Sequence, residues 1–140
     1  MPLSLEHERA KEAYEKVSSV IKNLGVEEKK EFKSWAKKFP SMVVSCGLLQ
    51  AALFYNRTTK KTVANQLYQV LNEYIRGYAR KKLNYSNDEN FDLVDYLINR
   101  VPDARTYLFL SAESVKFLTW VKNFAEALIK EGIQREGNGG

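Results

Sequence analysis

The sequence is poor in the residues on which catalytic and metal sites depend. Its 140 residues include one cysteine, Cys46, and one histidine, His7. An internal disulfide and a metal site built on several imidazoles are therefore excluded within one chain. A nucleophilic pair of Cys46 and His7 would have to join a thiol in an apolar segment to an exposed terminal helix. We therefore interpret Cys46 as a buried structural thiol.

Phosphate loops and carboxylate clusters are equally scarce. The glycines at Gly25, Gly47 and Gly77 are isolated, so no glycine-rich phosphate loop is present. One acidic cluster, made of Asp88, Glu89, Asp92 and Asp95, has the chemistry to hold a divalent cation. A solvated loop with helix-capping carboxylates explains the same residues, and we favour that interpretation. We expect no catalytic residues, no metal, no cofactor and no enzymatic activity.

Charge is missing from one long segment. No residue of Phe39–Asn56 is charged, although 28% of the whole sequence is. A membrane span needs about 20 strongly apolar residues, and this segment contains polar residues and Pro40. The amino terminus also lacks the apolar core of a signal peptide. We therefore predict a helix buried on nearly every side, in a cytoplasmic protein without membrane contact.

Apolar residues recur at spacings of three and four throughout the sequence, which is typical of amphipathic helices. No segment alternates as a strand would, and no repeat or linker is visible. We predict an all-α fold: a single-domain helical bundle of about six helices with a central buried helix. The domain is expected to cover residues 1–131, followed by a flexible tail over residues 132–140.

Breakers and caps suggest where the helices begin and end. The first helix is expected to stop before Gly25, and the second to run from about Glu27 to Lys38. Pro40 is expected to end the second helix and open the central one, with Gly47 inside that helix facing a close neighbour. The remaining helices are predicted from about Thr59 to Asn84, from about Phe91 to Asn99, and from an N-cap at Ser111, with Glu113 in the first turn, to Lys130.

The net charge is +5, which permits contact with nucleic acid without requiring it. Basic residues gather in three clusters: Lys37 and Lys38; Arg57, Lys60 and Lys61; and Arg76, Arg80, Lys81 and Lys82. Such clusters can neutralise phosphates without regard to base sequence. They can equally solvate the surface, and Lys37 with Lys38 can satisfy a helix C-terminus. Similarly, most of the eight tyrosines fit core packing, whereas exposed ones could stack on bases or anchor a protein partner.

Three segments, in order, resemble one protein family. They are ERAKEAYEKV (Glu8–Val17), KKFPSMVVSCGLLQAALFY (Lys37–Tyr55) and YLFLSAESVKFLTWVKNFAEALI (Tyr107–Ile129). Together they resemble the small all-helical subunit of the type III-B CRISPR effector, the RNA-targeting Cmr complex of antiviral defence. The resemblance covers nearly the whole length, and the middle segment carries most of it because Pro40 and Gly47 fix its register.

The resemblance implies a non-catalytic subunit. Its copies stack into a minor filament, and its partners are the large and backbone subunits, copies of itself, guide RNA and target RNA. Matching the family segments gives the RNA-contacting candidates Lys37, Lys38, Arg57, Lys60, Lys61, Lys116 and Lys122. Asn123 departs from the family pattern, in which a second basic residue often follows the lysine. The cluster of Arg76, Arg80, Lys81 and Lys82 rests on charge alone. The alternative is a protein-only scaffold or adaptor, whose cations merely keep it soluble.

Overall fold

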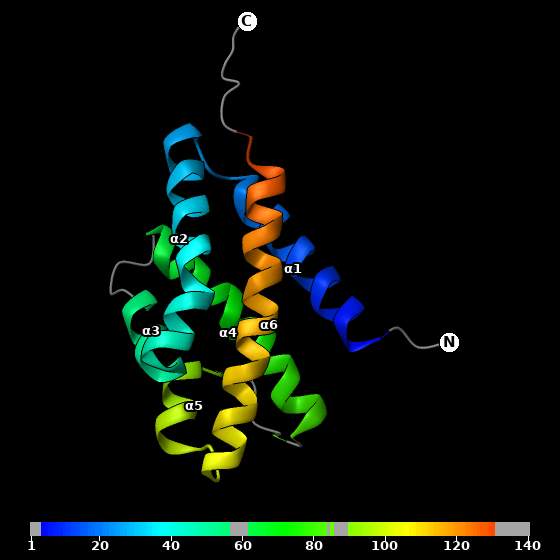
Figure 1. Ribbon diagram of the computed structural model, residues 1–140, viewed down its shortest axis with the longest axis vertical. Helices are drawn as coiled ribbons and strands as arrows, with labels where there is room; N and C mark the ends of the chain where they lie inside the picture. The colour runs from blue at the N-terminus through cyan, green and yellow to red at the C-terminus, as the bar shows by residue number, and fades with distance from the viewer. Residues whose placement is uncertain (1–3, 57–61, 84, 86–89, 131–140) are drawn as a thin grey trace, which may run out of the picture.

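The computed structural model describes residues 4–56, 62–83, 85 and 90–130, and within these ranges it contains six helices and no strand (Figure 1). The helices are α1 (Leu5–Ile21), α2 (Val26–Cys46), α3 (Leu48–Tyr55), α4 (Val63–Lys82), α5 (Leu93–Asn99) and α6 (Ala104–Leu128). The predicted all-α class is confirmed. Of the RNA-contacting candidates, Arg57, Lys60 and Lys61 lie outside the described residues, as does the predicted tail.

Helix α6 lies between α1 and α2 and runs antiparallel to α2 along its whole length (Figure 1). Lys33 Nζ in α2 donates a hydrogen bond to the carbonyl oxygen of Ile129, just beyond α6, at 3.4 Å. On the other flank of α6, Glu113 pairs with Arg9 of α1. Helix α4 lies behind this layer and is the most buried helix, with 11 of its 20 residues buried. The predicted position of the central buried helix, over Phe39–Asn56, is therefore wrong, because α4 is the more buried helix.

The predicted break at Pro40 is wrong, because α2 continues through the proline to Cys46. Proline removes one backbone hydrogen bond and costs about 3 kcal/mol in a helix interior. The side chains of Ala36, Phe39, Pro40 and Val43 are nevertheless all buried along one stripe. Because the apolar stripe continues with helical spacing across the proline, burial of both halves offsets that local cost.

The break falls instead at Gly47, which ends α2 and precedes α3. Its φ of +94° is a conformation that residues with a side chain rarely adopt. The hydroxyl of Tyr107, in α6, accepts a hydrogen bond from Leu49 N at 3.0 Å and satisfies one of the first amides of α3. The predicted single helix over Phe39–Asn56 is therefore wrong: the segment contains the end of one helix and the whole of another.

The uncharged segment is also less buried than its composition suggests. Val44 is 72% exposed and Leu53 is 52% exposed. Cys46 is exposed as well, so the expected buried thiol is wrong. A short helix that packs on one side leaves its opposite face in water, and charge-free composition alone does not distinguish that case from full burial.

The last helix begins earlier than predicted. Asp103 is its N-cap, and its Oδ1 accepts a hydrogen bond from Thr106 N at 2.8 Å. Ser111 lies inside the helix, where its hydroxyl donates to the carbonyl oxygen of Tyr107 at 3.0 Å. The predicted cap at Ser111 is therefore wrong. Glu113 is buried rather than placed in an exposed first turn.

Candidate nucleic-acid interface

Two of the lysine candidates lie along the contact between α2 and α6. Lys37 follows Lys33 by one helical turn, on the face of α2 that borders α6. On α6, Phe124 faces Tyr14 of α1, and Lys122, two residues earlier, projects from the opposite flank. From the Lys33–Ile129 contact, Lys37 lies about 6 Å down α2 and Lys122 about 10 Å down α6, in the same direction. We call Lys33, Lys37 and Lys122 the α2–α6 seam.

Lys38 projects from another face of α2, toward α3. Its Nζ lies over the ring of Trp35, 5.4 Å from the centroid. The Trp35 ring contacts Phe54 and Tyr55 of α3. Consecutive residues on a helix are about 100° apart around the axis. Of the two exposed lysines at the middle of α2, Lys37 therefore points toward α6 and Lys38 toward α3. The alternative in which they cap a helix C-terminus is wrong, because α2 continues to Cys46, two turns beyond Lys38.

Lys116 does not join the seam. It is exposed on α6, one turn beyond Glu113, and its charge helps to lower the pKa of that carboxyl group. Lys122 follows later on the same helix and is only half-buried. At about 100° per residue, the two lysines are about 120° apart around the helix axis. The structure therefore separates the two candidates that the last helix contributes.

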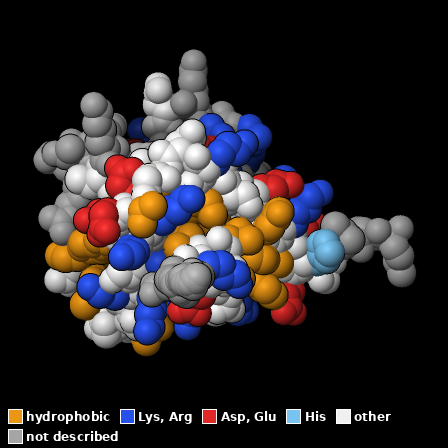
Figure 2. Space-filling view, turned by 90° about the horizontal axis from the view of Figure 1, so that it is seen from above, with side chains coloured by type: hydrophobic (Ala, Val, Ile, Leu, Met, Phe, Trp, Pro, Cys, Tyr) orange, Lys and Arg blue, Asp and Glu red, His pale blue; other side chains and the backbone are white. Residues whose placement is uncertain are grey.

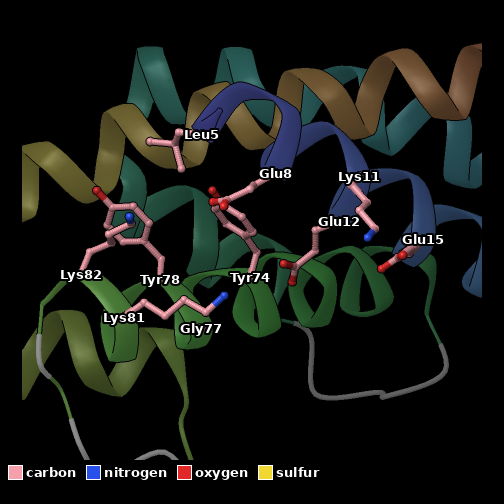
Figure 3. Close-up of a pocket in the computed structure, with 10 residues that line it drawn as sticks. All are labelled: Leu5, Glu8, Lys11, Glu12, Glu15, Tyr74, Gly77, Tyr78, Lys81 and Lys82. Atoms are coloured by element: carbon pink, nitrogen blue, oxygen red, sulfur yellow. The ribbon is translucent and has the colours of Figure 1, made fainter. Parts of the chain in front are cut away.

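The cluster on α4 faces carboxylates. Arg76 Nη2 lies 2.7 Å from Glu73 Oε1. Lys81 and Lys82 line a groove between α1 and α4, with a volume of about 380 Å³, together with the α1 carboxylates Glu8, Glu12 and Glu15 (Figure 3). Burial raises the pKa of Glu12, and the charge of Lys81 acts in the opposite direction. Arg80 is exposed nearby. A phosphate here would meet charges of both signs, so this cluster is the weaker candidate.

A signal that the charge clusters alone do not reveal is the distribution of acidic residues. From Phe32 to Asn72 the sequence contains no aspartate and no glutamate. The same span contains six cations: Lys33, Lys37, Lys38, Arg57, Lys60 and Lys61. It covers most of α2, all of α3 and the first half of α4. We call it the acid-free span, and it adds Lys33 to the candidates. Lys30, one helical turn before Lys33, lies outside this span, and its Nζ is paired with Glu27 Oε2 at 3.7 Å.

The end of the molecule at which α6 stops has a different character. Figure 2 views this end, and its Lys and Arg side chains lie in separate groups with carboxylates and apolar side chains between them. Long-range attraction of a polyanion needs an uninterrupted field of one sign. Apart from Lys33, which lies at this end, the cations of the acid-free span have no carboxylate between them in the sequence and are therefore a better match to a phosphate backbone.

The described part of the chain offers neither a metal-binding cluster nor a membrane-spanning helix. Within it, no group of three or more His, Cys, Asp or Glu side chains is arranged to hold a metal ion. Asp88 and Glu89 of the predicted acidic loop lie outside the described residues. Asp92 caps α5 by accepting a hydrogen bond from Asp95 N at 3.1 Å. None of the described helices is both long enough and apolar enough to cross a bilayer.

Comparison with known proteins gives consistent matches along the chain. The profile of a family described as "CRISPR-associated protein (Cas_Cmr5)" matches residues 5–128. The match thus extends from the first residue of α1 to the last residue of α6. The "CRISPR system Cmr subunit Cmr5" of Thermus thermophilus is 33% identical over 125 residues, covering 87% of this chain and 93% of the relative. The X-ray crystal structure of a CRISPR-associated Cmr5 family protein, also from Thermus thermophilus, matches with a TM-score of 0.69 and 27% identity. That match covers 91% of this chain and 100% of the other.

Proposed function

The chain belongs to the Cmr5 family of CRISPR-associated proteins and is a Cmr complex subunit in CRISPR defence, and on that premise we propose that it is a non-catalytic subunit that contacts target RNA. In this proposal its copies stack into the minor filament, beside the large and backbone subunits. It acts in the cytoplasm, where guide and target RNA lie along the assembled filaments. The RNA backbone is held by lysines of the α2–α6 seam and by Lys38.

The observation that carries the proposal is the acid-free span. The exposed lysines Lys37 and Lys38 lie on a stretch of sequence without a single carboxylate. Lys81 and Lys82 of α4, in contrast, line a groove with Glu8, Glu12 and Glu15. Lysine contacts to phosphate position an RNA strand without reading its bases. Pairing with the guide supplies the sequence specificity, as in guided systems generally. One copy offers only a few such contacts, so the isolated chain is expected to bind RNA weakly.

The test compares two double charge reversals in the assembled complex. Lys37→Glu with Lys38→Glu should weaken target-RNA binding by at least about tenfold, equivalent to about 1.4 kcal/mol. Lys81→Glu with Lys82→Glu is the matched control, because it reverses the same number of charges on α4. Its binding should stay within about twofold of the unmodified complex. Circular dichroism and thermal melting of each variant show whether the fold is intact. Equal losses for both pairs, or no loss for either, would contradict the proposed RNA contact.

Exposed apolar side chains favour the alternative, a protein-only scaffold. Besides Val44 and Leu53, the side chains of Leu108 (66% exposed) and Phe109 (59% exposed) remain in water. Exposed large apolar residues are typical of surfaces that bind other proteins. In a pure scaffold, Val44→Asp and Leu108→Asp would abolish co-purification with the other subunits. The lysine reversals would then leave RNA binding unchanged.

A further inference from the structure

An aromatic cluster lies at the surface where α2 meets α3. The rings of Trp35 and Phe54 are 5.8 Å apart at 38°, and Trp35 meets the ring of Tyr55 edge-on at 5.3 Å. The hydroxyl of Tyr55 donates to the carbonyl oxygen of Trp35 at 2.7 Å. Tyr55 is itself fully buried and stacks on Phe39 at 3.7 Å. The buried rings therefore anchor Trp35 and Phe54 in fixed positions.

The outer part of this cluster is open to water. Phe54 is 46% exposed, and Trp35 is partly exposed beside it. Packing in the core does not account for Phe54, because Ala51, Ala52 and Tyr55 already fill the buried face of α3. Large aromatic side chains held rigidly at a surface lose little conformational entropy when a ligand covers them.

The positive charge around the aromatic cluster favours an anionic ligand. Lys38 Nζ already lies over the Trp35 ring, and Lys37 is its neighbour in the sequence. Both rings and both lysines belong to the acid-free span. Aromatic faces combined with cations and without carboxylates are the recurring chemistry of sites for single-stranded nucleic acid. A duplex, whose bases are stacked inside, would use only the lysines.

We propose that Phe54 and Trp35 form a stacking platform for an unpaired base of single-stranded RNA, with Lys38 holding a phosphate beside the platform and Lys37 a further phosphate toward the α2–α6 seam. This inference rests on the proposed function and adds a base contact to it. Stacking on a ring tolerates any base, so the platform would hold a strand without reading its sequence. Loss of one such contact weakens binding by about 5- to 150-fold.

The chain supplies its own reporter. Its two tryptophans are Trp35 and Trp120, and Trp120 lies on α6 against Phe124. In a Trp120→Phe variant, Trp35 is the only tryptophan, so excitation selective for tryptophan over tyrosine reports on Trp35 alone. At low salt, titration with oligouridylate should quench this emission in a saturable manner. An abasic ribose-phosphate chain of the same length should bind more weakly, by about tenfold, and should not quench.

The matched variants remove the aromatic ring but keep an apolar side chain. In the Trp120→Phe background, Phe54→Leu should weaken oligouridylate binding by about tenfold and leave the salt dependence unchanged. Phe109→Leu alters another exposed phenylalanine, on α6, and should leave binding unchanged. Lys37→Gln with Lys38→Gln should instead reduce the slope of log affinity against log salt by about 1.4, or about 0.7 for each phosphate contact. Melting temperatures verify that each variant is folded.

The outcomes separate the platform from the proposed function. If the lysine variant weakens binding but Phe54→Leu and the abasic chain do not differ from their references, the platform is overturned and the backbone contact stands. If neither the lysine nor the ring variant changes binding in the assembled complex, both ideas fail. If Phe54→Leu releases another subunit without changing RNA affinity, the cluster is a protein interface and the platform is overturned.

Discussion

Arg9 in α1 donates two hydrogen bonds to the carboxylate of Glu113 in α6, from Nε to Oε2 at 2.6 Å and from Nη2 to Oε1 at 2.9 Å. Both residues are buried, and the hydroxyl of Tyr74 in α4 also donates to Oε2. Burial alone would raise the pKa of Glu113. The hydrogen bonds from Arg9 and Tyr74 outweigh it, so the pKa of Glu113 lies below its ordinary value. One carboxylate thus joins three helices.

Replacing Arg9 with methionine should destabilise the protein strongly. The Arg9→Met variant leaves the Glu113 carboxylate buried without its cation, which typically costs about 3–5 kcal/mol. Urea unfolding at neutral pH measures the loss. The double variant Arg9→Met with Glu113→Leu removes both charges and should recover most of the stability. A single-variant loss below about 1 kcal/mol would mean that water reaches the carboxylate.

The same carboxylate should make stability depend on pH. Because the folded pKa of Glu113 lies below its ordinary value of 4.5, the folded state holds this proton more weakly than the unfolded state. Its stabilising contribution is complete above the unfolded pKa and is lost as the pH falls through the folded pKa. The free energy of unfolding should therefore fall less steeply between about pH 6 and pH 3 in Glu113→Gln than in the unmodified protein. Parallel curves would contradict this assignment.

Two glycine substitutions should change stability in opposite directions. Gly47→Ala forces a side chain into a φ of +94°, which should cost about 1–3 kcal/mol. Gly77→Ala is the control: an added Cβ there meets nothing within 4 Å, inside helix α4. It should stabilise the protein by about 0.5–1 kcal/mol. Thermal or urea unfolding measures both. A destabilised Gly77→Ala would show that the groove beside α4 needs the space.

The thiol of Cys46 should react without unfolding. Cys46 is exposed at the end of α2, with its sulfur 3.7 Å from Ser45 Oγ. Ellman's reagent should therefore titrate one thiol per chain in the native protein, at a rate close to that in urea. The Cys46→Ser variant should give no signal and should melt within a few degrees of the unmodified protein. A thiol that reacts only after denaturation would contradict the exposed position.

The apolar period is sufficient to predict six helices and an all-α domain, and the family profile confirms the resemblance seen in three segments. The errors in the predicted helix boundaries arise where the helix preference of a single residue disagrees with the spacing of the buried apolar residues. Pro40 and Ser111 have the residue types of helix boundaries, yet the buried stripe passes through both regions. Gly47 is predicted inside a helix, but it separates α2 from α3 with a positive φ that no residue pattern reveals.

Charge patterns predict the site less completely than periodicity predicts the fold. The lysines are visible in the sequence, but their surroundings depend on tertiary packing. Lys81 faces carboxylates of α1, the first helix, which is distant from Lys81 in the sequence. Likewise, Trp35 and Phe54 meet only because the chain turns at Gly47. The absence of acids from Phe32 to Asn72 is a property of the sequence alone and indicates the same surface.

The pairing of the first helix with the last also determines when folding can finish. While the chain is being synthesised, Arg9 emerges from the ribosome 104 residues before its partner Glu113. Contacts between distant segments form late, because closing a long loop costs entropy. Until α6 emerges, α1 remains an amphipathic helix without its main packing surface, and tertiary packing supplies most of the stability of a helix in a protein. The domain therefore closes only after α6 has emerged, and a chain interrupted before Glu113 leaves α1 without the surface on which it packs.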